Sequence, residues 1–271
     1  IRDSHCVYVD TGFMRKGETE EVREMFNEMG IKLQVVDASD RFFSNLEGIT
    51  DPEEKRKVIG EQFIRVFEEE QSNCGAKFLV QGTIAPDWIE SGGGERDVIK
   101  SHHNVGGLPE DVDLKIVEPL REFYKDEVRQ IARELGIKSS ERQPFPGPGL
   151  AVRVLGDLTR PRVEACREAC HIVETRLREA AEEGICDLPW QYFAALLPVR
   201  SVGVHGDARV HGETVVVRAV TSLDGMSARY SPIPHDVLSA ISTEITNSLK
   251  GQVNRVVYDI THKPPGTIEW E

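Results

Sequence analysis

The sequence predicts an α/β protein in which a doubly wound parallel sheet is followed by a smaller α+β module. In the first part of the chain, short apolar runs that fit strands alternate with amphipathic stretches that fit helices, a pattern typical of βαβ units. These runs end in polar residues, as expected where the carboxyl ends of parallel strands line a ligand site. Beyond Gly156 the alternation stops and longer elements follow. We therefore expect one domain over residues 1–155 and a second over residues 156–271.

The first two expected strands enclose an amphipathic helix. The apolar run at residues 6–9 ends in the polar stretch 10–12, which fits a buried strand followed by a turn. A helix is expected over residues 19–29, because its apolar residues recur at spacings of three and four and Gly30 follows them. Residues 33–37 fit the next strand of a parallel sheet.

A longer helix and two further strands complete the first domain. The helix expected over residues 51–70 opens with a capping residue and a proline, which both favour a helix start. Residues 78–83 form an apolar run that ends in polar residues, and residues 114–117 fit another short strand. A helix over residues 125–135 follows and stops at a glycine.

The segment 90–107 breaks this pattern. It combines consecutive glycines, several charges and the pair His102 and His103. Glycines give the backbone freedom at an entropic cost, and this suits a mobile lid as well as a plain linker. The composition alone leaves both readings open.

The second module begins after a proline- and glycine-rich turn at residues 142–149, which is incompatible with a regular helix or a central strand. Its expected elements are a helix over 160–183, strands over 194–204 and 213–221, a helix over 235–249 and a strand over 253–260. The run 214–220 is almost continuously apolar, which indicates a strand covered on both faces by helices or by a second subunit.

Composition limits the class of protein. The 271 residues are 39% hydrophobic and 29% charged, with a formal net charge of −13, so the surface does not suit duplex DNA or an anionic membrane. No apolar stretch approaches the roughly 20 residues that a membrane span needs. We expect a cytoplasmic protein without a nucleic-acid or membrane partner.

Five sparse cysteines indicate reduced thiols rather than a disulfide framework. Cys166 and Cys170 stand four residues apart in a helical pattern, with His171 beside them. Packing in the core is the favoured interpretation, since free cysteine is among the most buried residue types, and a metal site is the alternative.

Positive side chains near glycines, prolines or expected strand ends are candidates for contacts with phosphate. They are Arg15, Lys16, Lys100, Arg153, Arg255 and Lys263. Arginine suits bidentate recognition of phosphate, and lysine acts as a point charge on a flexible stem. Each could equally be a solvated surface charge. The chain ends in an unusually apolar segment with two prolines, an isoleucine and a tryptophan, so we expect the terminus to dock against the protein.

Several collinear segments together resemble the GMP synthetase family. They are residues 9–12 with 15–18, 50–56, 81–83, 99–109, 142–150, 201–204, 253–260 and 263–271. Together they extend over nearly the whole chain and end in Thr-Ile-Glu-Trp-Glu. The resemblance implies an adenine-nucleotide α-hydrolase-like domain followed by a dimerisation domain that completes the site for xanthosine monophosphate (XMP).

The resemblance also implies a reaction. With Mg²⁺ and ATP, the purine oxygen at C2 of XMP attacks the α-phosphorus, pyrophosphate leaves, and ammonia then displaces AMP to give GMP. In-line displacement at phosphorus depends mainly on positioning and charge stabilisation, which fits the matched lysines and arginines. The family further implies a homodimer and an ammonia source in a glutaminase subunit or a fused glutaminase domain.

Roles transfer to residues position by position. Catalytic and lid residues implied by the resemblance are Asp87, Glu90, Lys100, His102 and His103. Residues implied to bind ATP are Asp10, Gly82, Thr83 and Asn104. Residues implied to bind XMP are Arg15, Pro146, Gly147, Pro148, Arg255, Lys263, Ile268 and Glu269. No metal ligands are assigned.

One family feature is absent from the sequence. The glycine-rich loop Ser-Gly-Gly-x-Asp-Ser, which grips the ATP phosphates and holds a candidate Mg²⁺ ligand, has no counterpart, and residues 91–94 lie in the wrong place to replace it. We therefore expect no GMP synthetase activity from residues 1–271 alone. Two other hypotheses are a related ATP pyrophosphatase, such as NAD synthetase or a tRNA-modifying enzyme, and a non-enzymatic binding subunit.

Overall fold

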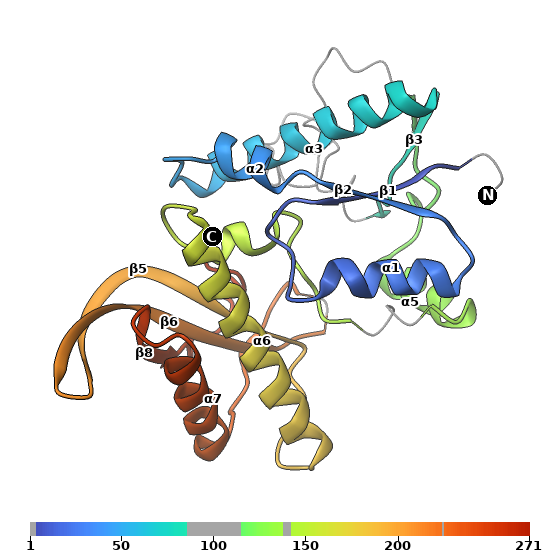
Figure 1. Cartoon of the computed structure of the whole chain (residues 1–271). Helices are drawn as coiled ribbons and strands as arrows, with labels where there is room; N and C mark the ends of the chain where they lie inside the picture. Colours follow the sequence, from blue (N-terminus) through green and yellow to red (C-terminus); the bar gives the residue numbers. More distant parts are fainter. Residues whose placement is uncertain (1–3, 86–114, 138–141, 224) are drawn as a thin grey trace. The chain divides into compact units, whose positions relative to one another are not determined.

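The computed structural model describes residues 4–85, 115–137, 142–223 and 225–271 (Figure 1). These residues fall into two compact units. Unit 1 comprises residues 1–12, 21–45 and 53–142, and unit 2 comprises residues 13–20, 46–52 and 143–271. The domain boundary expected after residue 155 stays a prediction.

Unit 1 contains parallel strand pairs. Strand β1 (Cys6–Asp10) pairs in parallel with β2 (Leu33–Asp37), with Cys6 opposite Leu33 and Asp10 opposite Asp37. Helix α1 (Glu18–Glu28) lies between them in the chain. Strand β3 (Phe78–Val80) pairs in parallel with β4 (Lys115–Val117). The α/β class and parallel pairing are thus confirmed, whereas a single doubly wound sheet stays a prediction.

The helices of unit 1 differ in part from those expected. The predicted helix over 51–70 extends to α3 (Pro52–Cys74), and α5 is Lys125–Glu134. Helix α2 (Ser39–Asn45) was not expected; it starts directly after β2, where Asp37 Oδ1 accepts a hydrogen bond from the Ser39 N–H at 3.0 Å. None of the described helices has both the length and the apolar character that a membrane span requires.

Unit 2 is built on a four-stranded sheet. Strands β5 (Gln191–His205) and β6 (Ala208–Thr221) form an antiparallel hairpin, β7 (Arg229–Tyr230) pairs with the end of β6, and β8 (Val253–Tyr258) pairs with β6 in parallel. The two expected strands over 194–204 and 213–221 are therefore too short. The missing residues extend the same ladder, residues 191–193 at one end and residues 205 and 208–212 toward the tight connection between β5 and β6.

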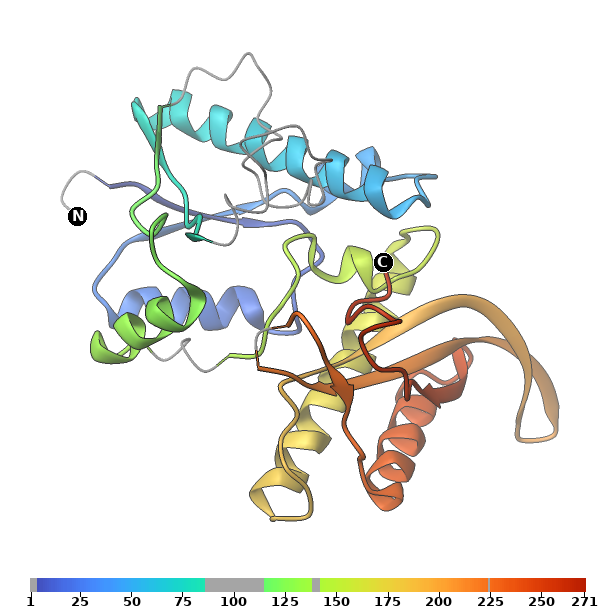
Figure 2. The same ribbon diagram turned by 180° about the vertical axis from the view of Figure 1, so that it is seen from behind.

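Helices cover one face of this sheet and the chain terminus covers the other. Helices α6 (Arg160–Glu182) and α7 (His235–Ser248) lie side by side on the face seen in Figure 1. The segment after β8 crosses the opposite face, seen in Figure 2. Val215, Val216, Val217 and Val220 are at most 1% exposed, so the prediction of a strand covered on both faces is confirmed.

The proline- and glycine-rich turn leads into a short 3₁₀ helix, η2 (Gly149–Val152), which was not expected. Gly149 has a φ of +64°, and the Leu150 N–H donates to the carbonyl of Phe13 at 2.8 Å. A Cβ added at Gly149 would lie 2.4 Å from the Phe13 oxygen. Glycine is therefore required here for its backbone conformation and for the close approach of residue 13.

Replacement of Gly149 by alanine tests this packing. We expect Gly149→Ala to lower the free energy of unfolding by about 3 kcal/mol, since a left-handed alanine costs roughly 1–2 kcal/mol and the steric overlap adds to it. Gly206→Ala is the matched control, because Gly206 also has a positive φ of 60° but its added Cβ meets nothing within 4 Å. Equal losses in urea unfolding of the two variants would contradict the steric argument.

Candidate functional site

A buried arginine organises unit 2 near its proline- and glycine-rich turn. Arg153 directly follows η2 and is 1% exposed. Its Nε donates to Glu269 Oε2 at 3.0 Å and its Nη2 donates to Glu269 Oε1 at 2.8 Å, so the pair is bidentate. The Gln191 side-chain amide also donates to Glu269 Oε1, at 2.7 Å. The carboxyl end of the chain is thereby tied to the start of β5.

Aromatic rings lie against the same guanidinium. The Arg153 Cζ lies 4.1 Å from the centroid of the Phe193 ring and 5.1 Å from that of Phe145. Arg15 Cζ lies 4.2 Å from the Phe145 centroid. Phe145 directly precedes Pro146, the first residue of the turn predicted to bind XMP. The two cations and the ring fix this turn, because guanidinium groups are attracted to aromatic faces.

Arg15 is held in place by polar groups of the same unit. Its Nη2 donates to the Gln143 carbonyl at 3.2 Å, and it forms ion pairs with Glu18 at 3.4 Å and Glu174 at 3.8 Å. Gln143 Oε1 in turn accepts from the Tyr192 N–H at 2.9 Å. Two positive charges and the turn therefore share one polar cluster.

Glu269 keeps capacity for one more hydrogen bond. Among the described residues, its Oε1 accepts from Arg153 and from Gln191, whereas its Oε2 accepts from Arg153 alone. Each carboxylate oxygen has two acceptor sites, so one site on Oε2 remains. An N–H group of a ligand suits that site.

Gln143 Nε2 and Arg153 Nη1 are among the buried polar atoms of this cluster that make no hydrogen bond within the described part of the chain. Buried polar groups in native proteins are nearly always hydrogen-bonded. The donor groups of Gln143 and Arg153 therefore keep hydrogen-bonding capacity that a ligand or a water molecule can satisfy.

Burial and charge shift the ionisation of this cluster. Burial alone would lower the pKa of Arg153, but the charge and hydrogen bonds of Glu269 reverse that effect, so the pKa is raised and the cation is stable. The pKa of Glu174 is raised, because burial disfavours its carboxylate more than the nearby Arg15, Arg178 and Arg153 favour it. Burial thus outweighs the ion pairs of Glu174 in setting its ionisation.

The other residues predicted to bind XMP have separate contacts. Lys263 Nζ donates to the Gly225 carbonyl at 2.8 Å, and the carbonyl of Ile268 accepts from Arg218 Nε at 3.4 Å. Arg255 is exposed on β8, and its Nε donates to Ser201 Oγ of β5 at 3.2 Å. The structure thus brings Arg15, the turn and Glu269 together through Arg153, and it gives Arg255 a partner on the hairpin.

The residues predicted to bind ATP lie in unit 1 or outside the described residues. Asp10 ends β1, and its Oδ1 accepts from the Gly12 N–H at 2.9 Å. Gly82 and Thr83 follow β3, with Thr83 buried. Predicted residues outside the described part of the chain are Asp87, Glu90, Lys100, His102, His103 and Asn104.

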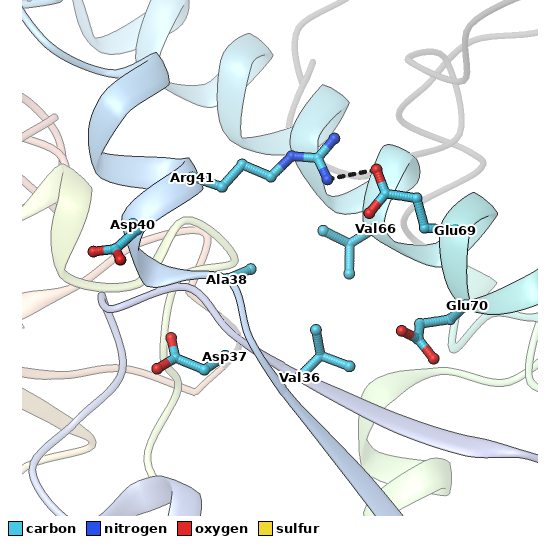
Figure 3. A pocket seen from close by; sticks show the side chains of 8 residues that line it. All are labelled: Val36, Asp37, Ala38, Asp40, Arg41, Val66, Glu69 and Glu70. Atoms are coloured by element: carbon cyan, nitrogen blue, oxygen red, sulfur yellow. Dashed lines mark hydrogen bonds and ion pairs between the residues drawn. The ribbon is translucent and has the colours of Figure 1, made fainter. Parts of the chain in front are cut away.

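A cavity of about 290 Å³ in unit 1 is a poor candidate for a polyphosphate site. It lies between the end of β2 and helices α2 and α3 (Figure 3). Its lining includes the acidic residues Asp37, Asp40, Glu69 and Glu70, and its arginine, Arg41, already pairs with Glu69 at 2.7 Å. The surplus of negative charge opposes an anionic ligand.

The described residues contain no group of three or more His, Cys, Asp or Glu side chains that could hold a metal ion. Cys166 and Cys170 are buried and donate to the carbonyl of Ala194 at 3.7 and 3.1 Å, which confirms that they pack in the core. The described residues therefore provide no Mg²⁺ site of this kind.

Comparison with known proteins supplies the family. A family model described as the GMP synthase C terminal domain matches residues 178–270. The B subunit of the glutamine-hydrolyzing GMP synthase of Thermoplasma acidophilum is 55% identical over 266 residues, covering 98% of this chain and 84% of that protein. The chain belongs to the family of these GMP synthase B subunits. The protein of the same name from Thermococcus kodakarensis is 58% identical, and that from Halobacterium salinarum is 59% identical. Each match covers 98% of this chain, and it covers 85% of the first protein and 83% of the second.

Membership of the GMP synthase family makes this chain a ligase subunit, and the resemblance drawn from its motifs is confirmed. Sequence reasoning nevertheless missed several residues of the cluster. Gln191 and Phe193 carry no local signal, because they begin an ordinary apolar strand. Arg218 does carry one, since a single charge interrupts the apolar run of β6.

The pairing of Glu269 with a buried cation predicts a large effect on stability. We expect Glu269→Gln to lower the free energy of unfolding by about 3 kcal/mol, because Arg153 would remain buried without this countercharge. The control is Glu271→Gln. The wild-type Glu271 carboxylate accepts a hydrogen bond from the Gly156 N–H at 3.2 Å, and the amide oxygen of glutamine can accept the same bond. We expect it to lose less than about 1 kcal/mol. Comparable losses in urea unfolding would contradict the role of Arg153.

The raised pKa of Glu174 predicts that the stability of the protein depends on pH. Because this carboxyl binds its proton more tightly in the folded state, its contribution to stability falls as the pH rises from its ordinary value of 4.5 through the raised pKa. We expect Glu174→Gln to remove this loss and to be at least as stable as the wild type at pH 7. The exposed Glu179→Gln is the control, with an unchanged profile. Urea unfolding between pH 5 and 7 measures the free energy of unfolding of each variant. A Glu174→Gln variant less stable than the wild type at pH 7 would refute the argument.

Proposed function

We propose that this chain binds XMP in the polar cluster of unit 2 and takes part in the ATP-dependent amination of XMP to GMP through an adenylated XMP intermediate, together with a phosphate-binding loop that residues 1–271 do not contain. Family membership supports the overall reaction, since the relatives are named GMP synthase. AMP and pyrophosphate are the other products. The reaction belongs to purine nucleotide biosynthesis.

The observation that carries the proposal is the meeting of three segments far apart in the sequence. Arg15, the turn containing Phe145 and the terminal Glu269 were each expected to contact XMP, and Arg153 links the last two by an ion pair and a ring contact. Arg153 and Glu269 are 116 residues apart. Unrelated surface charges would not be expected to lie together in one buried cluster.

The chemistry of the cluster fits a purine nucleotide. Arg15 offers a cation for an anionic group, and the backbone of Pro146, Gly147 and Pro148 offers a flat surface with few donors. The remaining acceptor site on Glu269 Oε2 suits a purine N–H, which a free phosphate lacks. Lys263, Ile268 and Arg255 are proposed to complete the contacts with XMP.

The reaction consists of two displacements. The purine oxygen at C2 forms a bond to the α-phosphorus of ATP as the bond to pyrophosphate breaks, and ammonia then adds at C2 as AMP leaves with that oxygen. Positioning and charge stabilisation supply most of the catalysis in such transfers. Residues proposed to act on ATP or in closure over it are Asp10, Gly82, Thr83, Asp87, Glu90, Lys100, His102, His103 and Asn104. Mg²⁺ is proposed to accompany ATP.

Partner and assembly follow from the family. The relatives are named as one subunit of a glutamine-hydrolysing enzyme, which supports a separate glutaminase subunit as the source of ammonia. We propose that the second domain forms a homodimer and that the parallel strand pairs of unit 1 belong to one doubly wound sheet.

Titration calorimetry of the chain with XMP tests the proposal. Arg15→Ala should raise the dissociation constant for XMP about tenfold or more, because a contact to a charged group contributes about 1.5–3 kcal/mol. Lys16→Ala is the matched control, since Lys16 is the neighbouring cation, half exposed and paired with Glu168; its dissociation constant should stay within about twofold. Thermal unfolding checks that both variants fold. No XMP binding by the wild type, or equal affinity in Arg15→Ala, would overturn the assignment.

A further inference from the structure

A second arginine lies fully buried in unit 2, in the last part of β6. Arg218 is 0% exposed and is flanked by Val217 and Ala219, which are also buried. The hydrogen bonds of Arg218 go to residues 259–268, so its side chain points to the face of the sheet that the terminal segment crosses (Figure 2).

The Arg218 guanidinium contacts the terminal segment through all three of its nitrogens. Nη1 donates to the carbonyls of Asp259 and Thr261, Nη2 donates to the carbonyl of Thr267 at 3.0 Å, and Nε donates to that of Ile268 at 3.4 Å. The Asp259 carboxylate lies 3.3 Å from Nη1 and supplies the countercharge. One cation is thus surrounded by four backbone carbonyls and one carboxylate.

These contacts fall in two stretches that bracket a loop. The first stretch is 259–261 and the second is 267–268, and Lys263 lies between them. Glu269 follows directly after the second stretch. Arg218 therefore holds both ends of the loop that carries Lys263 and sets the point from which Glu269 reaches Arg153.

Further contacts fix the same loop. The backbone of Lys263 exchanges two hydrogen bonds with that of Ala228, at 2.8 and 3.0 Å. Trp270 Nε1 donates to Asp259 Oδ2 at 3.1 Å, so Asp259 joins Arg218 to the last residues of the chain. The loop is tied at its ends by side chains and near its middle by the backbone.

Simple stabilisation of the sheet does not explain an arginine at this position. Its neighbours are valine and alanine, and removing a cation from water opposes folding. A well-packed apolar side chain would suit the strand, but it has no donor for the four carbonyls. A lysine has three donors around one point and lacks the planar fork that serves two stretches of backbone at once.

We propose that Arg218 is a positioning residue for XMP binding: it clamps the loop 259–268 so that Lys263 and Glu269 are ordered before XMP arrives. This inference rests on the proposed function, since it assigns Arg218 a role in the same site. Without the clamp the loop samples other arrangements, and the apparent dissociation constant rises as the competent fraction falls. Arg218 itself touches the loop and not the reacting atoms.

The test compares Arg218→Lys with a matched control. Arg162→Lys removes contacts of the same kind in the same unit, because Arg162 Nε donates to Glu213 at 2.9 Å and its Nη2 donates to the carbonyl of Leu155 at 2.9 Å. Arg162 has no contact with the terminal segment in the described structure. Calorimetry with XMP and hydrogen exchange of the amides of residues 259–271 are measured for the chain and both variants.

We expect Arg218→Lys to raise the dissociation constant for XMP about tenfold and to speed exchange in residues 259–271 more than elsewhere in unit 2, with protection restored at saturating XMP. Arg162→Lys should bind XMP within about twofold of the wild type. Wild-type affinity in a folded Arg218→Lys would overturn the proposal and leave the proposed function intact. Absence of XMP binding by the wild type would overturn both.

A gentler variant keeps the test decisive if Arg218→Lys does not fold. Trp270→Phe retains an aromatic ring at a 40% exposed position and removes the hydrogen bond to Asp259, the carboxylate that Arg218 pairs with. We expect it to raise the dissociation constant for XMP about threefold, with faster exchange in the same residues. Unchanged affinity together with faster exchange would show that order in the loop does not govern XMP binding.

Discussion

Two arginines buried against one face of the sheet in unit 2 constrain the rest of that unit. Arg153 and Arg218 are both within 1% of complete burial, and a cation removed from water must be paired and hydrogen-bonded. For Arg153 the carboxylate comes from Glu269, and for Arg218 it comes from Asp259. Both acids follow β8 near the end of the chain. The terminal segment must therefore cross the sheet and dock, and this explains why an apolar, proline-containing terminus is ordered.

The same constraint links stability to the proposed binding of XMP. Arg153 is neutralised by Glu269, yet it leaves Nη1 and one acceptor site on Glu269 Oε2 available. The groups that hold the terminus in place are thus also the groups offered to a ligand. The arginines of the cluster are matched by carboxylates, so a nucleotide would meet oriented guanidinium donors there rather than a surplus of positive charge. The cavity in unit 1 has one arginine among four acidic residues.

Unit 1 and unit 2 bring their candidate site residues together in different ways. The parallel pairs of unit 1 bring the ends of neighbouring strands into register, as with Asp10 and Asp37, and such edges suit nucleotide binding. Unit 2 instead gathers residues by long-range side-chain contacts around Phe145 and Arg153. Membership of the GMP synthase family is consistent with both, because the relatives match this chain over 98% of its length.

The sequence by itself determined the elements whose patterns are local. Periodic apolar residues predicted β1, β2, α6 and α7 to within a few residues, and the composition of the last residues predicted a docked terminus. The elements α2, η2 and β7 were missed, because they show neither an apolar run nor a helical period in the sequence. Motifs also led to the family, because collinear strings of residues survive in the sequence without reference to the fold.

Only the tertiary structure decided which charges meet. Arg153 was one of six cations with equal claims, and nothing local joins it to Glu269, 116 residues away. Arg218 contacts mostly backbone carbonyls, and every residue has a carbonyl, so no pattern of side chains marks its partners. Burial and pairing depend on how the chain packs over distances that local periodicity does not record, and they decide whether a charged residue is a surface group or the centre of a site.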